Sequence, residues 1–223
     1  MTIIYSIVAT VLGVVVMAML AYPLSRPNYK YKKIATFFIF FTMLFSGGLI
    51  PTYIWITRYL HLGDTIWVYI LPCLVNAFHV IVIRSFFQGL PQALMESAKI
   101  DGASELQTFF KIVMPLSKPV IATISLLTLL SRWNDWNTAL IYIKSSNLYS
   151  LQYLLQKILR EAEFVKNMAE SSPVAGVDLD LSNLPSVTIR FAMCMVAAGP
   201  MLIIFPFFQK YFAKGLTVGA VKG

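Results

Sequence analysis

The stretch ESAKIDGASELQTFFKIVMPL, residues Glu96 to Leu116, is the longest polar segment with helical patterning between two strongly apolar regions of the chain. Gly102 marks a bend in it, because a glycine inside a helix costs about 1 kcal/mol relative to alanine. Residues Gln92 to Ile100 contain neither glycine nor proline and predict a helix before the bend. Ser104 and Gln107 have the spacing of a capping box and predict a second helix after it.

The second of these helices has one apolar face. Its apolar residues recur at helical spacing and are Leu106, Phe109, Phe110 and Val113. From spacing alone, the whole stretch is equally well explained as a solvent-facing hairpin that only joins two membrane spans.

The stretch also resembles the EAA signature of ABC importer permeases. That signature reads Glu-Ala-Ala, three residues, Gly, nine residues, Ile, one residue and Leu-Pro, and the chain follows it from Glu96 to Pro115. The chain departs from it at Ser97, which replaces an alanine, and at Met114, which replaces a leucine. Residues Lys99 to Ala103 are similar to the carbohydrate branch of the family. The resemblance implies a coupling helix that docks into a cleft of a cytoplasmic ATPase subunit.

The same resemblance implies which residues couple the chain to the ATPase. They are Glu96, Ser97, Ala98, Asp101, Gly102, Ile112 and Pro115. Glu96 is expected to pair with a basic group of the ATPase, and Gly102 to let the two short helices turn. The apolar face is expected to pack against the membrane spans or to line the ATPase cleft.

Composition identifies a membrane protein. Of the 223 residues, 58% are apolar and 13% are charged, whereas a soluble domain has roughly 25% charged residues. The net charge of +8 does not indicate nucleic-acid binding, because the basic residues fall in short loops between apolar segments. Cys73, Cys194, His61 and His79 have no partners at the spacing of a disulfide framework or a metal site, so we expect neither metal nor cofactor.

Hydropathy predicts an all-α membrane protein with five transmembrane helices and one membrane domain. The spans are expected at residues 3–24, 34–57, 66–83, 119–143 and 187–208, with the signature in a cytoplasmic loop at 84–118 and an external loop at 144–186. Eleven of the 18 Lys and Arg residues then lie in the three cytoplasmic segments, as the positive-inside rule requires. Gly47, Gly48 and Pro51 predict a kink in the second span that faces the protein interior.

Polar residues inside the spans are candidates for a solute path. Pro72, Asn76 and His79 are expected to share one helix face, where they either form interhelical hydrogen bonds or line the path. The fourth span ends in a polar sequence with an expected Arg132–Asp135 pair.

The candidate path residues in that sequence are Trp133, Asn134 and Asn137. The Trp-Asn pair resembles that of the family at this place, so it could touch sugar. Trp133 and Trp136 could equally be anchors at the outer membrane interface.

The external loop contains a predicted amphipathic helix at Tyr149 to Ala169, expected on the outer surface. Residues Ser171 to Pro185 have turn-forming chemistry. By resemblance to maltose-type permeases, this loop probes an external solute-binding protein. The tail from Gln209 to Gly223 is expected in the cytoplasm, reaching toward the ATPase.

The resemblance implies the permease subunit of an ATP-driven importer in the cell membrane, moving carbohydrate and more specifically oligosaccharide. It has no catalytic residues, and a partner hydrolyses ATP. The implied partners are a cytoplasmic ATPase dimer, a second permease, an extracellular or lipid-anchored solute-binding protein and membrane lipid. Maltose-type permeases have six spans, so we expect either a missing first span or a chain with five spans. The alternatives are a permease for another small solute, a membrane-embedded enzyme, and a channel or secondary carrier.

Overall fold

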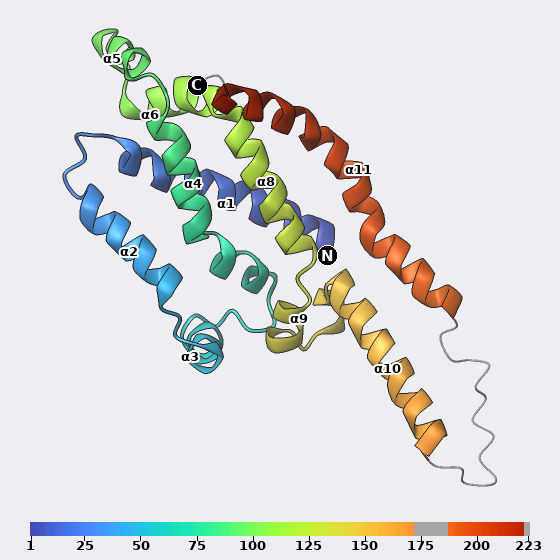
Figure 1. Cartoon of the computed structure of the whole chain (residues 1–223). Coiled ribbons are helices and arrows are strands. Elements are labelled where there is room, and N and C mark those ends of the chain that lie inside the picture. The colour runs from blue at the N-terminus through green and yellow to red at the C-terminus, as the bar shows by residue number, and fades with distance from the viewer. Residues whose placement is uncertain (172–186, 221–223) are drawn as a thin grey trace.

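The computed structural model describes residues 1–171 and 187–220, and this part of the chain is helical with no strand (Figure 1). The first half contains α1 Thr2–Ser25, α2 Lys32–Leu44, α3 Leu49–Ile54, η1 Trp55–Tyr59, η2 Ile66–Tyr69, η3 Leu71–Cys73, α4 Ala77–Gln88 and α5 Gln92–Ile100. The second half contains α6 Glu105–Thr108, η4 Phe109–Val113, α7 Met114–Leu116, α8 Lys118–Trp133, α9 Asn137–Tyr142, η5 Ser146–Leu148, α10 Leu151–Ser171 and α11 Val187–Ala220. The fold is therefore all-α, as predicted.

Helix α1 is the centre of the fold, because it packs against both α4 and α8. Its 24 residues carry no charge, and at 1.5 Å per residue they span about 36 Å, enough for a hydrocarbon core of ~30 Å. Gly13 allows the backbone at Leu74 to approach α1 closely. A Cβ added to Gly13 would lie 3.2 Å from the Leu74 carbonyl oxygen. Among the described residues, α1 alone is long and apolar enough to cross a membrane as one helix, and up to four crossings result if bent pairs count as one span each.

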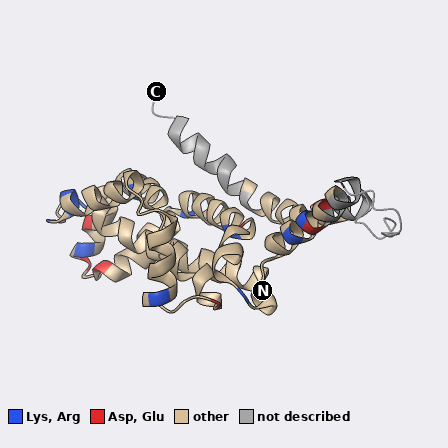
Figure 2. Ribbon diagram, turned by 90° about the horizontal axis from the view of Figure 1, so that it is seen from below, with Lys and Arg blue, Asp and Glu red and all other residues tan. Residues whose placement is uncertain are grey.

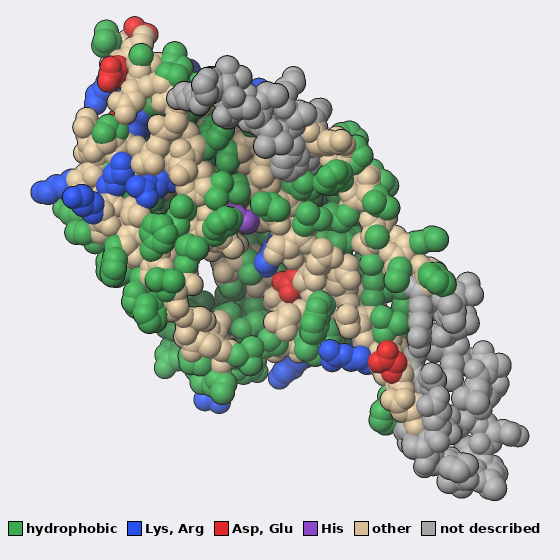
Figure 3. Space-filling view, viewed as in Figure 1, with side chains coloured by type: hydrophobic (Ala, Val, Ile, Leu, Met, Phe, Trp, Pro, Cys, Tyr) green, Lys and Arg blue, Asp and Glu red, His purple; other side chains and the backbone are tan. Residues whose placement is uncertain are grey.

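Charged residues are sparse in the helical body and gather mainly toward its two ends (Figure 2). Hydrophobic side chains cover much of the face seen in Figure 3. Both features are typical of a protein whose outer surface meets lipid.

The segment predicted as the second span is two helices. α2 and the α3–η1 helix meet at an angle of 111°. Gly48 lies in this break with φ of +85°, a conformation that glycine adopts without strain. The expected kink is therefore much sharper than a bend in one helix. It is also exposed in this chain and does not face the interior as predicted.

The segment predicted as the third span is also broken. Two short 3₁₀ turns, η2 and η3, precede α4, which is inclined to them by 47°. Asn76 lies at the break and caps α4, since its Oδ1 accepts a 3.1 Å hydrogen bond from the His79 amide. The predicted shared face of Pro72, Asn76 and His79 is wrong, because Pro72 lies in η3, before the change of direction.

The last helices also differ from the expected bounds. The expected fourth span is α8 followed by a separate α9, and α8 meets the preceding Glu105–Leu116 helix at 81°. α10 occupies the position of the predicted amphipathic helix, and α11 packs against α8 and continues past residue 208. Most of the predicted turn-rich segment at 171–185 and the last three residues of the tail lie outside the described residues.

Candidate coupling hairpin and polar hollow

The hairpin from α5 to α7 turns at Gly102, as the sequence predicts. Gly102 has φ of +78°, and no atom lies within 4 Å of an added Cβ. The turn ends α5 with a hydrogen bond of 2.9 Å from the Ala103 amide to the Ala98 carbonyl oxygen. Glycine is therefore needed here because the backbone is left-handed, and not because a larger side chain would collide with a neighbour.

The capping box predicted after the bend is present. The Gln107 amide donates to Ser104 Oγ at 3.2 Å, and the Ser104 amide donates to Gln107 Oε1 at 2.9 Å. This pair fixes where α6 begins, so the two arms of the hairpin leave Gly102 in defined directions.

The predicted apolar face is divided between two environments. Phe109 is 2% exposed and Val113 is fully buried, whereas Leu106 is 62% and Phe110 50% exposed. The wide π-helical turn η4 at Phe109–Val113 changes the helical spacing at this point. Phe109 and Val113 thus pack against the rest of the chain, as one of the two expectations had it. Leu106 and Phe110 are accessible to a partner protein.

The predicted coupling residues are mostly accessible. Glu96, Ser97, Asp101, Gly102 and Pro115 are exposed, and Ile112 is half-buried. Ala98 is the exception, because its side chain is only 7% exposed and faces the protein. Other large apolar side chains of the hairpin are exposed as well: Leu94, Ile100 and Leu116.

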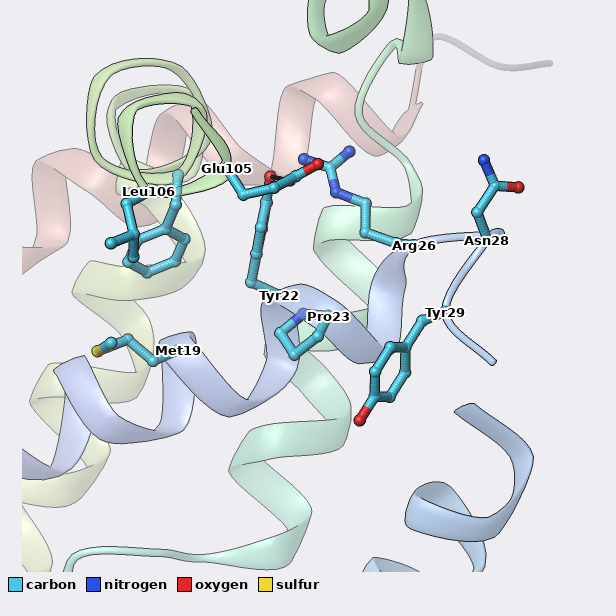
Figure 4. A pocket seen from close by; sticks show the side chains of 9 residues that line it. Met19, Tyr22, Pro23, Arg26, Asn28, Tyr29, Glu105 and Leu106 are labelled. Carbon is cyan, nitrogen blue, oxygen red and sulfur yellow. Dashed lines mark hydrogen bonds between the residues drawn. The ribbon is translucent and has the colours of Figure 1, made fainter. Parts of the chain in front are cut away.

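A contact that the sequence reasoning missed joins this hairpin to α1. The Tyr22 hydroxyl donates a 2.7 Å hydrogen bond to Glu105 Oε2, and the Tyr22 ring meets the Phe109 ring edge-on with centroids 5.2 Å apart. The Arg26 guanidinium lies over the Tyr22 ring, 4.3 Å from its centroid, and also donates a hydrogen bond to Met95 Sδ. Figure 4 shows Tyr22, Arg26 and Glu105 converging at the end of α1.

These residues border a cavity of about 390 Å³ between the end of α1 and the start of α6 (Figure 4). Within the described part of the chain, Arg26 Nε and Nη2 are buried and have no hydrogen-bond partner. The only sequence signal for this contact was the presence of Arg26 and Glu105 at the borders of two apolar segments, which does not specify that they meet.

Figure 3 shows a hollow beside a histidine, with a basic and an acidic side chain nearby. His79 Nδ1 lies 3.5 Å from Thr128 Oγ1, which links α4 to α8. Arg132 and Asp135 form the predicted ion pair, with Nη1 and Oδ2 3.4 Å apart.

The candidate path residues differ in exposure and in their contacts. Asn76, Asn134 and Asn137 are exposed, and Asn134 Oδ1 accepts a 3.3 Å hydrogen bond from Gln152 of α10. Trp133 is only 4% exposed, and its indole N–H donates to the Ala197 carbonyl oxygen of α11 at 2.8 Å. Trp133 is thus a contact between α8 and α11 in this structure.

Asp64 joins two segments that are far apart in the sequence. Its Oδ1 accepts from the amides of Lys144 and Ser145 at 2.9 and 2.8 Å, and its Oδ2 accepts from the Ser145 hydroxyl at 2.6 Å. These bonds lower the pKa of the Asp64 carboxyl, and the bond from the Ser145 hydroxyl contributes most. The turn after η1 is thereby tied to the segment that follows α9.

Comparison with known proteins identifies the arrangement of helices and hairpin. The family described as "Binding-protein-dependent transport system inner membrane component" matches residues 1–218. The chain belongs to this family of transport permeases. As an ABC-transporter permease, it is a membrane protein.

Two relatives of this permease come from Bacillus subtilis. The polygalacturonan/rhamnogalacturonan transport system permease protein YtcP is 40% identical over 224 residues, which cover 98% of this chain and 74% of that protein. Protein LplC is 41% identical over 222 residues, which cover 98% of this chain and 72% of that protein. This permease thus spans about three quarters of the length of either relative.

A solved structure has the same fold. It is the crystal structure of a bacterial ABC transporter involved in the import of the acidic polysaccharide alginate, with a TM-score of 0.78 and 31% sequence identity. The match covers 95% of this permease and 72% of the other chain. The similarity includes the α5–α8 region, because almost the whole chain is matched.

Proposed function

We propose that this permease is one membrane subunit of an ATP-driven importer of oligosaccharides, worked by a separate cytoplasmic ATPase dimer through the α5–α7 hairpin. The observation that carries the proposal is the divided apolar face. Phe109 and Val113 are buried and attach the hairpin to the spans, while Leu106 and Phe110 remain exposed on the surface of the hairpin. An element held on one side and free on the other can transmit movement from a docked partner.

Each part of the hairpin has a role in this proposal. Leu106 and Phe110 dock into an apolar cleft of the ATPase, and exposed Glu96 pairs with one of its basic groups. Ser97, Asp101, Ile112 and Pro115 complete the docking element, while buried Ala98 and the turn at Gly102 preserve its shape. ATP is hydrolysed by the partner, and the movement of its subunits passes through Phe109 and Tyr22 to α1 and α8.

The remaining partners follow from the family. A second permease completes the membrane path, and an external solute-binding protein delivers solute to the side that contains α10. His79, Asn76, Asn134 and Asn137 are proposed to line the path around the polar hollow. No nucleic acid takes part.

The solute class is supported by the names of the relatives. One is named for polygalacturonan and rhamnogalacturonan, others for arabinooligosaccharides and for melibiose, raffinose and stachyose. Competition for uptake by neutral and uronate-containing oligosaccharides of equal length would define the class. Failure of every oligosaccharide to compete, with competition by a non-carbohydrate solute, would contradict it.

The test of coupling is co-purification from membranes. The wild-type chain should bring down a nucleotide-hydrolysing protein, and the double variant Leu106→Ser with Phe110→Ser should lose it while remaining folded in the membrane. Tyr31→Ser is the matched control, because Tyr31 is also an exposed apolar side chain, at 56%, but lies outside the hairpin. Equal recovery of the ATPase with all three chains would refute docking through Leu106 and Phe110.

A further inference from the structure

A second cavity lies along α2, away from the coupling hairpin. It has a volume of about 970 Å³, at the upper end of the roughly 300–1,000 Å³ typical of ligand sites. Its apolar wall is formed by Phe37, Phe40, Phe41, Leu44 and Phe45. We call this cavity the α2 groove.

The wall of the α2 groove is an aromatic stripe. Phe37 and Phe41 lie one turn apart on α2, Phe45 follows at the end of the helix, and the Phe41 and Phe45 rings are stacked with centroids 4.5 Å apart. All three rings are exposed, and α2 has no buried residue. A long apolar molecule parallel to the helix would cover this stripe.

One end of the α2 groove is basic. Lys32 and Lys33 from the first turn of α2 and Arg84 from α4 line it, and none of its lining residues is acidic. Arg84 is held in place by a 3.1 Å hydrogen bond from its Nε to the Leu24 carbonyl oxygen at the end of α1. Figure 3 shows a group of Lys and Arg side chains beside the hydrophobic surface over this part of the molecule.

The position of these lysines is unfavourable unless an anion is present. The N-terminus of a helix carries a partial positive charge, which repels cations in the first turn. α2 begins with two lysines, and no side chain caps it and no acidic residue lies in its first turn. A phosphate at this place would compensate the lysines and Arg84 and interact favourably with the helix dipole.

A packed protein helix would explain only half of this arrangement. It would cover the phenylalanines but leave the cations at the helix N-terminus without a counter-charge. A molecule with a phosphate at one end and a hydrocarbon chain at the other satisfies both parts. Because the positive-inside rule places residues 26–33 on the cytoplasmic side, the basic end lies at the depth of the lipid headgroups of that leaflet.

We propose that the α2 groove binds one anionic phospholipid of the cytoplasmic leaflet, with its phosphate at Lys32, Lys33 and Arg84 and an acyl chain along Phe37, Phe41 and Phe45. The proposal depends on the membrane location of the chain and not on the nature of the transported solute. Basic pockets between helices on this side of a membrane are suited to anionic headgroups.

The experiment places a fluorescent reporter in the groove. Phe41→Trp is introduced into the assembled transporter in nanodiscs, and quenching by phosphatidylglycerol with brominated acyl chains is compared with quenching by brominated phosphatidylcholine. The signal of the unsubstituted chain, which has four tryptophans, is subtracted. We expect half-maximal quenching at a severalfold lower fraction of phosphatidylglycerol than of phosphatidylcholine.

The charge variants test the headgroup. Lys32→Gln with Lys33→Gln in the reporter chain should reduce the preference for phosphatidylglycerol by about fivefold for each lysine. Lys111→Gln with Lys118→Gln is the matched control, because it removes the same charge from the cytoplasmic side outside the groove. This control should keep the preference.

Two results would overturn the proposal. Equal quenching by the two lipids would mean that the groove holds unspecific lipid, and protection of the reporter from both lipids would mean that a protein helix covers it. Neither result depends on the lysine variants, so the proposal stays testable if those variants fail to fold.

Discussion

The Tyr22 hydroxyl donates a hydrogen bond of 2.7 Å to Glu105 Oε2, which connects the C-terminal end of α1 to the first residue of α6. Tyr22 is only 8% exposed, and its ring also contacts Phe109. Because α1 packs against α4 and α8, these two contacts connect the hairpin to the centre of the bundle.

We predict that Tyr22→Phe weakens this connection without unfolding the chain. The substitution keeps the ring and its packing and removes one hydrogen bond to a carboxylate at the surface, at a cost of about 1 kcal/mol. Uptake per ATP hydrolysed should fall in proteoliposomes, while the amount of bound ATPase stays the same. Glu105→Gln retains an acceptor oxygen and should lower this ratio less. An unchanged ratio with Tyr22→Phe would show that the bond does not transmit movement.

We predict that Gly102→Asp abolishes uptake and releases the ATPase from membranes. Any L-residue here would adopt the left-handed conformation, at about 1–2 kcal/mol, and the aspartate adds a charge at the exposed turn. Gly48→Ala is the control, because Gly48 has a similar φ of +85° and equally open surroundings but lies outside the hairpin. Its strain should leave ATPase binding intact. Normal uptake by Gly102→Asp would count against coupling through this turn.

Two neighbouring phenylalanines should respond in opposite ways. Phe109→Ala leaves a cavity in the core and should destabilise the chain by about 3–5 kcal/mol. Phe110→Ala changes an exposed side chain and should alter stability by less than about 1 kcal/mol, yet reduce ATPase binding. Thermal unfolding in detergent and co-purification separate the two effects. The assignment fails if Phe110→Ala is the less stable variant.

Trp133 and Asn137 separate packing from the solute path. Trp133→Phe loses the bond to Ala197 and should cost about 1 kcal/mol of stability without a change in the KM of uptake. Asn137→Ala removes an exposed amide and should raise that KM with little effect on stability. A raised KM for Trp133→Phe would place its side chain in contact with solute.

The Asp64 contacts predict a pH dependence with a defined sign. Ser145 and the two backbone amides hold the pKa of Asp64 below its ordinary value of 3.8. A lowered pKa in the folded state gives stability that is present above the ordinary value and is lost as the pH falls through the lowered one. The unfolding temperature of wild type should therefore exceed that of Asp64→Asn from neutral pH down to the ordinary pKa, and the difference should shrink below it and vanish once the pH has fallen through the lowered pKa.

The control for this prediction is Asp101→Asn, which removes the same charge far from Ser145. At neutral pH its unfolding temperature should differ from that of wild type by less than that of Asp64→Asn does. A difference for Asp64→Asn that grows on acidification would contradict the assigned contacts.

Local signals in the sequence predicted the hairpin well. Gly102 requires a positive φ, and Ser104 and Gln107 form their capping box from neighbouring residues alone, so no distant contact was needed to anticipate them. The resemblance to the family signature added the expectation that such a hairpin docks on an ATPase.

Contacts between distant segments could not be predicted in this way. The π-helical turn η4 separates Phe109 from Phe110 in burial, and a regular helical spacing cannot express this difference. Tryptophan is a residue type that is common at membrane interfaces, but the hydrogen-bond acceptor of the Trp133 indole lies 64 positions away in α11. Asn76 was expected in mid-helix and in fact begins one, because Asn76 and His79 form a cap where the chain changes direction.

The length of α2 has a consequence for biogenesis. Thirteen residues cover about 20 Å, or two thirds of a ~30 Å hydrocarbon layer, before the chain turns by 111° at residues 45–48. Peptide groups outside a helix are poorly tolerated against lipid tails. Beyond Phe45, where the α2 groove ends, shielding of this turn is expected from a neighbouring subunit, so a chain synthesised without its companions is expected to be an early target of membrane quality-control proteases.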